Sequence, residues 1–253
     1  MRRNSRRSSR KQQKSGVEGR TYVFIIAYRS RGNNAVRRDE LAHCIDTIKR
    51  GFTAYKRKYK IMIVEQNNDY LFNLGLLKNI GFLEEEKVSN RSRVYLHMNV
   101  DYSIDTTKEF PKELDDFDGN GFLDIYNVDT TVDTIIGGCT CFNADVFKKI
   151  NGYPIGLYGW GADDAALRNR VNYHKIPYIV NAVTNSGWII VDGGADARDP
   201  EKQITWQENM TKATDDIEKT GLTSTVYTVD GDGEFKDTAN HVVHKLVNFE
   251  YKP

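Results

Sequence analysis

Two adjacent carboxylates follow a Gly-Trp-Gly turn in the stretch YGWGADDAALRNRV, which spans residues 158–171. Asp163 and Asp164 lie at the start of a predicted helix, where the helix dipole stabilises negative charge. A purely structural role in starting that helix is one interpretation. The two glycines are poor helix formers and expose backbone amides beside the indole of Trp160. A carboxylate in this setting could instead act as a general base that takes a proton from a hydroxyl group.

A second candidate is the motif NVDYSID, which directly follows the predicted strand RVYLHM. Asp101 ends that strand, and Asn99 stands two positions before it. Mg²⁺ and Mn²⁺ prefer oxygen ligands and keep phosphate oxygens in their coordination shell, so such a carboxylate can hold either ion on a nucleotide diphosphate. An ordinary turn at the end of a strand is the alternative interpretation.

Two arginines follow the first predicted strand, in the sequence Tyr28-Arg29-Ser30-Arg31. Side chains two positions apart on an extended chain point to the same side. Two guanidinium groups placed in this way could bind a diphosphate through paired hydrogen bonds. Without further support, a solvated loop explains the same residues.

The stretch DDFDGNG imitates the start of a calcium-binding loop, with Asp116, Asp118, Asn120 and Gly121 at positions one, three, five and six. Asn127 stands at position twelve, where such loops require glutamate. No pair of flanking helices is evident, so the sequence favours an acidic turn.

Apolar, β-rich runs alternate along the chain with segments of helical periodicity. Strands are predicted near residues 21–28, 59–66, 93–98, 134–142, 177–183, 187–191 and 224–229. Helices are predicted near residues 36–56, 69–80, 144–150, 163–174 and 206–219, with Asn68 capping the second and Gly81 ending it. This alternation indicates an α/β domain with a mostly parallel sheet flanked by helices, in which ligands bind at the carboxyl ends of the strands.

Charge divides the chain into a basic tail and an acidic body. Residues 1–20 contain eight of the 36 basic and one of the 35 acidic residues, which leaves 28 basic and 34 acidic residues, a net charge of −6, for residues 21–253. The tail is predicted to be disordered, as a solubilising or targeting arm that could contact an acidic surface. The acidic body argues against binding to nucleic acid.

No run approaches the roughly 20 apolar residues of a membrane span, and no signal peptide is evident, so we expect a soluble, cytoplasmic protein. The three cysteines, Cys44, Cys139 and Cys141, lack the spacing of a zinc site and suit packing in a reducing compartment.

Five stretches together resemble the β-1,4-galactosyltransferase family in order and spacing: IIAYRSR, QNNDYLFNLGLLKNIGF, NVDYSID, GLTSTVY and the block from Gly137 to Val171. The resemblance runs from about Tyr22 to about Tyr227. It implies the GT-A fold, which binds nucleotide sugars, in a single domain over residues 21–253. It also implies an enzyme that transfers a sugar from a UDP-sugar to a hydroxyl with inversion at the anomeric carbon, usually with Mn²⁺.

The resemblance also assigns roles to individual residues. It implies that Asp164 is the catalytic base, that Asp101 binds Mn²⁺ or Mg²⁺, and that Trp160 closes over the donor on a mobile loop. The residues expected to contact substrate are Arg29, Arg31, Asn99, Ile135, Gly138, Trp160, Gly161 and Asp163.

Several positions depart from the family pattern. Asn99 replaces an aspartate, Leu74 replaces a phosphate-binding arginine, and Ile135 replaces an aromatic residue that lines the donor pocket in galactose-transferring members. Asp192 replaces a metal-binding histidine and remains an acceptable ligand, whereas Ile189 cannot bind a metal. We therefore expect a donor carrying galactose, a related hexose or an N-acetylhexosamine, and a glycan acceptor.

Three functions follow from these observations. The first is an unanchored, metal-assisted glycosyltransferase, which would suit glycan assembly in a virus or a microbe. The second is an inactive descendant that binds a nucleotide sugar or a glycan. The third is a nucleic-acid-binding protein, which only the tail suggests.

Overall fold

A computed structural model describes residues 19–30, 35–88, 92–126, 136–159, 161–183, 186–191, 201–237, 239 and 241–250. Four residues assigned above to the site, Arg31, Ile135, Trp160 and Asp192, lie outside these ranges.

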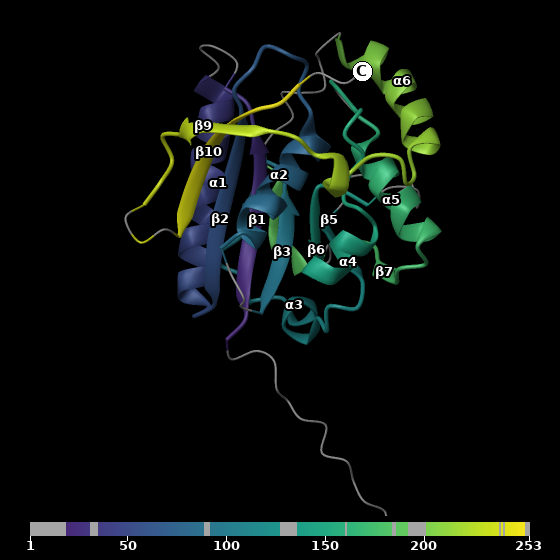
Figure 1. The fold of residues 1–253 in the computed structure, drawn as a ribbon. Helices are drawn as coiled ribbons and strands as arrows, with labels where there is room; N and C mark the ends of the chain where they lie inside the picture. The colour runs from purple at the N-terminus through teal and green to yellow at the C-terminus, as the bar shows by residue number, and fades with distance from the viewer. Residues whose placement is uncertain are drawn as a thin grey trace, which may run out of the picture.

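An eight-stranded sheet organises the described chain (Figure 1). Its strands, in spatial order, are β7 (Tyr178–Ile179), β5 (Phe122–Tyr126), β6 (Cys139–Phe142), β3 (Arg93–Met98), β1 (Thr21–Tyr28), β2 (Lys58–Gln66), β10 (Val242–Asn248) and β9 (Thr228–Asp232). β1 is parallel to β2 and β3, β10 is parallel to β2, and β7 is parallel to β5. β6 runs antiparallel to β3 and β5, and β9 runs antiparallel to β10. The predicted α/β class with a mostly parallel sheet is confirmed.

Both faces of the sheet are buried, because alternate residues of each central strand enter opposite cores. On β1, Tyr22, Phe24 and Ile26 pack beneath α1 (Ala35–Ala54). The intervening residues of β1 face a second core, which α2 (Leu74–Glu86), α4 (Ala144–Lys149) and α5 (Asp163–Tyr173) cover. Both strand faces are therefore apolar, and the polar side chains gather at the strand ends.

The second predicted helix has different ends from those expected. Asn73, not Asn68, caps α2, and its Oδ1 accepts a hydrogen bond from the Leu76 amide at 2.9 Å. The helix continues through Gly81 to Glu86. A Cβ at Gly81 would lie 2.6 Å from Cγ2 of Ile25, so this glycine allows the helix to approach the sheet closely. Close packing, rather than helix termination, explains the residue.

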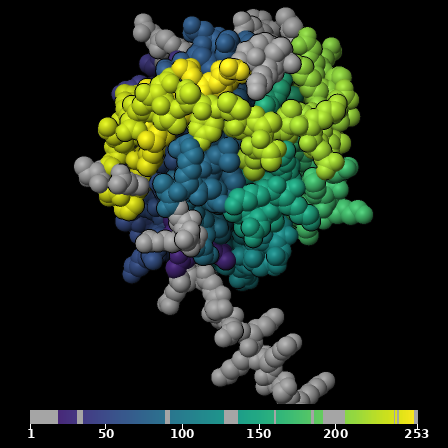
Figure 2. Space-filling model, in the orientation of Figure 1, coloured from purple at the N-terminus to yellow at the C-terminus, as the bar shows by residue number. Residues whose placement is uncertain are grey.

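The C-terminal third also departs from the prediction. α6 spans Glu201–Asp215, so it begins and ends earlier than predicted. The Asp216 carboxylate accepts a hydrogen bond from the Thr220 amide at 2.8 Å, which closes a turn where the helix was expected to continue. Of the strand expected at 224–229, only residues 228 and 229 are strand, as the start of β9. Ser224 ends the short helix η3 (Leu222–Ser224), and the chain between the two elements is irregular. This segment crosses the front of the molecule as a continuous band (Figure 2).

Four elements were not predicted: the strands β4 (Tyr102–Ile104), β5 and β10, and the short helix α3 (Lys112–Asp116). β4 pairs in a separate two-stranded sheet with β8 (Ile189–Val191), which lies within the strand predicted at 187–191. The stretch after α3 is an acidic turn, in which Asp118 Oδ1 accepts from the Asn120 amide at 2.9 Å. All three cysteines are buried, and none of them forms a disulfide. In the ranges that the structure describes, no helix is long and apolar enough to span a membrane.

Candidate active site

Two consecutive glycines bring the start of α5 against the end of β3. A Cβ on Gly137 would lie 2.0 Å from Cγ of Asp164, so any side chain there would displace the carboxylate. Gly138 has a φ of +76°, and its carbonyl accepts a hydrogen bond from the Asn99 amide at 3.0 Å. The Asp163–Asp164 pair and the Asn99–Asp101 motif, more than 60 residues apart in sequence, therefore share one site.

A buried lysine lies at the centre of this site. Lys78 of α2 is 1% exposed, and its Nζ donates to Oδ1 of Asn99 at 3.3 Å. The same ammonium group lies 5.5 Å from the centre of the Tyr153 ring. Burial lowers the pKa of Lys78, whereas the nearby charges of Asp164, Asp163 and Asp101 oppose that shift. One cation thus faces all three carboxylates.

The pKa values of Asp163 and Asp164 are both raised. Burial, followed by the charge of Asp164, raises the pKa of Asp163 to about 7, against the influence of Lys78 and the Gly75 amide. Burial also raises the pKa of Asp164, and Lys78 limits the increase. Asp164 keeps part of its surface open to solvent, whereas Asp163 is buried. A partly accessible carboxylate with a raised pKa has the properties of a general base.

Asp101 is the described residue best suited to hold a divalent cation. It is half-buried on the loop between β3 and β4. Burial, and then the charges of Asp101 and Asp164, raise the pKa of the neighbouring Tyr102 phenol. No three His, Cys, Asp or Glu side chains gather as metal ligands within the described ranges. A single carboxylate fits Mg²⁺ or Mn²⁺ if phosphate oxygens and water complete the shell.

Arg29 lies at the carboxyl end of β1, as predicted. Its Nη2 donates to the carbonyl oxygen of Asn68 at 3.2 Å, and its Nη1 binds the carbonyl of Tyr70. Arg29 therefore ties the loop after β1 to the loop after β2. Asn99, Asp101, Gly138, Asp163 and Asp164 gather around Lys78 and the glycine pair, and Arg29 lies on a neighbouring strand end.

α6 holds the turn that contains Gly161. Nδ2 of Asn209 donates to the carbonyl oxygens of Tyr158 at 2.9 Å and Gly161 at 3.2 Å. A Cβ on Gly161, which has a φ of +90°, would lie 2.6 Å from the Trp206 indole. The turn before the two carboxylates is thus positioned by a helix that follows it in sequence by 40 residues.

Two site residues were missed by the sequence analysis. Lys78 lies in the apolar segment LGLLKNIGF, where a lone charged residue on the buried face of a helix is the signal that could have revealed it. Asp124 is fully buried on β5, and burial and Asp164 raise its pKa to about 7. A lone aspartate in the run FLDIY offers a similar but weaker signal.

Comparison with known proteins finds similar sequences. A family model described as the N-terminal domain of galactosyltransferase matches residues 121–182, which include Gly138, Asp163 and Asp164. β-1,4-Galactosyltransferase 6 of Homo sapiens is 30% identical over 122 residues, which are 46% of this chain and 30% of that protein. β-1,4-Galactosyltransferase 4 of Mus musculus is 31% identical over 124 residues, 47% of this chain and 34% of that protein. The resemblance to the β-1,4-galactosyltransferase family is confirmed.

The similarity to β-1,4-galactosyltransferases extends to the fold. The structure of a mutant Drosophila β-1,4-galactosyltransferase 7 in complex with manganese, UDP-Gal and xylobiose matches with a TM-score of 0.68 at 17% identity. The match covers 91% of this chain and 95% of that one, which confirms the GT-A fold. The sequence matches span only about a third of the length of the first curated relatives.

Proposed function

We propose that this chain is an inverting glycosyltransferase that moves a sugar from a UDP-sugar to a glycan hydroxyl. The observation that carries the proposal is the meeting of Asp164, Asp101 and Lys78 around Gly137 and Gly138. An inverting transfer needs a base beside the acceptor and positive charge beside the departing diphosphate. In this arrangement Asp164 is the candidate base, and a cation held by Asp101 would supply the positive charge.

In this mechanism Asp164 accepts the proton of the acceptor hydroxyl as its oxygen attacks the anomeric carbon. The bond to UDP breaks on the opposite side of that carbon, so the configuration inverts. Lys78 stabilises the carboxylate form of Asp164, and Asp163 stays buried behind it. The turn that contains Gly161 limits the access of water, which would otherwise hydrolyse the donor.

Asp101, and Asp192 beyond the described residues, are proposed to hold Mn²⁺ or Mg²⁺. When bound, the ion would neutralise charge on the diphosphate as a Lewis acid.

The donor sugar is proposed to be galactose, a related hexose or an N-acetylhexosamine. Ile135 in place of an aromatic residue favours a roomier donor pocket. A relative from Lymnaea stagnalis that is named an N-acetylglucosaminyltransferase is 29% identical over 122 residues. A donor screen should therefore include UDP-N-acetylhexosamines as well as UDP-hexoses.

The proposal is tested by Asp164→Asn. We expect the variant to lose about 10²- to 10⁴-fold in turnover, because the amide cannot accept the proton, while it still binds UDP. A screen of UDP-sugars with Mn²⁺, read as UDP release, measures turnover, and calorimetry with UDP measures binding. Asp145→Asn, an exposed carboxylate in the first turn of α4, is the matched control. Full turnover in Asp164→Asn would exclude this base.

A catalytically inactive nucleotide-sugar-binding or glycan-binding protein is the second candidate. It is favoured by Asn99, whose side-chain oxygen is occupied by Lys78, and by Leu74 in place of an arginine. Metal-dependent binding of UDP without turnover of any donor would favour this function.

A further inference from the structure

A buried glutamate connects three strands beside Arg29. Glu65 lies at the end of β2, paired in register with Tyr28 of β1 and Leu246 of β10. It is 9% exposed, yet its pKa is lowered, because hydrogen bonds from His244 and Ser30 outweigh the effect of burial. A buried carboxylate that remains ionised in this way is held by its donors.

The donors to Glu65 come from two separate elements. The amide of Ser30 donates to Oε1 at 3.2 Å, and the Ser30 hydroxyl binds the same oxygen. Nε2 of the fully buried His244 lies 2.8 Å from Oε2. Both carboxylate oxygens are therefore engaged, one by the loop after β1 and the other by β10.

The histidine is itself fixed. Its Nδ1 accepts a hydrogen bond from the Phe235 amide at 3.3 Å, so Nε2 is the ring nitrogen that faces Glu65. This order excludes a serine hydrolase triad, because the glutamate separates the serine from the histidine. The Ser30–Glu65–His244 cluster is arranged to hold a loop rather than to activate a nucleophile.

Ser30 directly follows Arg29, whose guanidinium binds two carbonyl groups of the loop after β2. We propose that Glu65, oriented by His244, is a positioning residue for the donor, because it fixes the backbone that places Arg29 beside the diphosphate. This inference rests on the proposed function, in which Arg29 binds UDP.

A double-mutant cycle tests this inference, with UDP affinity measured by calorimetry at saturating Mn²⁺. We expect Glu65→Gln to weaken UDP binding about tenfold, or ~1.4 kcal/mol, because an amide cannot accept both sets of donors. In an Arg29→Ala background the same change should have no further effect, since Glu65 acts through Arg29. In turnover assays the KM for the donor should rise while kcat is retained.

Glu84→Gln is the matched control. Glu84, on α2, is also a partly buried carboxylate, and it accepts hydrogen bonds from a lysine and a tyrosine. We expect it to leave UDP affinity unchanged. If Glu65→Gln fails to fold, Ser30→Ala offers a milder test, because it removes only the hydroxyl donor. It should also weaken UDP binding.

The outcomes separate the two proposals. Unchanged UDP affinity in Glu65→Gln, or losses that add in the double variant, would overturn the positioning role while the donor site stands. Absence of UDP binding by the wild-type chain would instead contradict the proposed function.

Discussion

At the scale of single residues, the site combines several carboxylates with one buried cation. Asp163 and Asp164 lie at the N-terminus of α5, where the helix dipole favours their charge, but burial opposes it more strongly. The charge of Lys78 only partly offsets the unfavourable burial of the two carboxylates, because Lys78 is itself buried. Opposing effects of this kind on the pKa are typical of catalytic sites, where pKa values must lie near the working pH.

Asp163→Asn should stabilise the ligand-free protein, and more so at high pH. Folded Asp163 holds its proton up to a pH of about 7, whereas an unfolded aspartate releases it near 3.8. The stabilisation that the proton provides is complete below pH 3.8 and is lost as the pH rises through 7. Asp163→Asn does not lose stability in this way. We therefore expect the difference in the free energy of unfolding between the variant and the wild type to grow by roughly 2–3 kcal/mol between pH 5 and pH 8.

Urea unfolding curves of both proteins at the two pH values measure this difference. Asp145→Asn serves again as control, because its exposed carboxylate is in solvent in both states. If the difference in the free energy of unfolding between Asp163→Asn and the wild type is equal at pH 5 and pH 8, Asp163 titrates normally.

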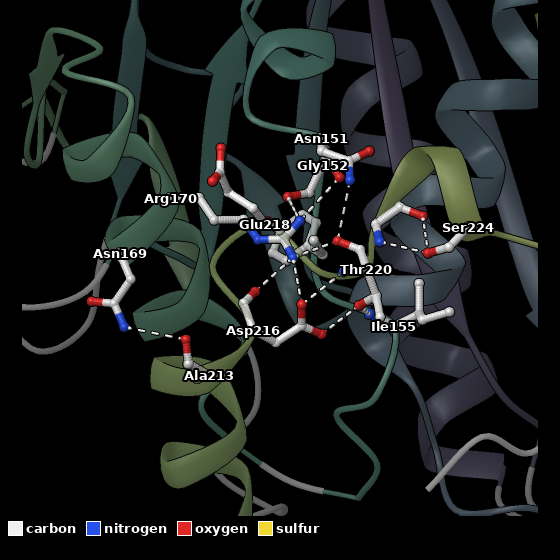
Figure 3. Close-up of polar contacts among 12 residues, drawn as sticks. Asn151, Gly152, Ile155, Asn169, Arg170, Ala213, Asp216, Glu218, Thr220 and Ser224 are labelled. Atoms are coloured by element: carbon white, nitrogen blue, oxygen red, sulfur yellow. Dashed lines mark hydrogen bonds and ion pairs between the residues drawn. The ribbon is translucent and has the colours of Figure 1, made fainter.

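At the scale of elements, a buried arginine joins α5 to the end of α6 (Figure 3). Arg170 is 1% exposed and donates to four backbone carbonyls, those of Asn151 at 3.0 Å, Gly152 at 3.0 Å, Asp216 at 2.8 Å and Thr220 at 2.6 Å. Burial lowers its pKa to about 10. Because α6 also holds the turn at Gly161, this network supports the site from a distance.

Arg170→Met should destabilise the fold by roughly 3–5 kcal/mol, because four carbonyl groups lose a donor and Asp216 loses its ion-pair partner. The carbonyls of Asn151 and Thr220 each keep one other donor, the Leu222 amide and Nδ2 of Asn151. Arg168→Met, two residues away on the same helix, is the matched control. The Arg168 guanidinium stacks 4.2 Å from the Tyr178 ring, and its loss should cost about 1 kcal/mol. Denaturant unfolding measures the stability of both variants. Equal losses in the free energy of unfolding would show that the carbonyl contacts of Arg170 contribute little.

At the scale of the whole molecule, charge distinguishes a basic tail from an acidic body. Residues 1–18 carry seven basic residues and one acidic residue. Arg20 was counted with the tail in the sequence analysis, but its guanidinium donates to the carbonyls of Leu114 at 3.0 Å and Phe117 at 2.7 Å. The folded unit therefore includes Arg20.

Deletion of residues 1–18 should leave UDP affinity and the melting temperature unchanged, because none of the described site contacts involves them. It should abolish sedimentation with anionic lipid vesicles, an interaction that we expect salt to weaken. Vesicle binding that survives the deletion would place the contact on the body. A loss of UDP affinity would make the tail part of the donor site.

Local sequence determined the three parallel strands β1, β2 and β3 and the start of α4, and it supplied the candidate catalytic residues. Runs of β-branched and aromatic residues predicted β1, β2 and β3, and Asn143 capped α4 as expected, because these features act over a few residues. Asp101, Asp163 and Asp164 were recognised from short motifs whose residue types carry their chemistry.

Only the tertiary structure decided how those residues meet. The close approach of Gly137 to Asp164, the passage of α2 through Gly81 and the placement of Lys78 among three carboxylates depend on packing between distant segments. The same is true of β10, which brings His244 to Glu65 across 179 positions of sequence. Burial and the proximity of charge set these pKa values, and both quantities exist only once the chain has folded.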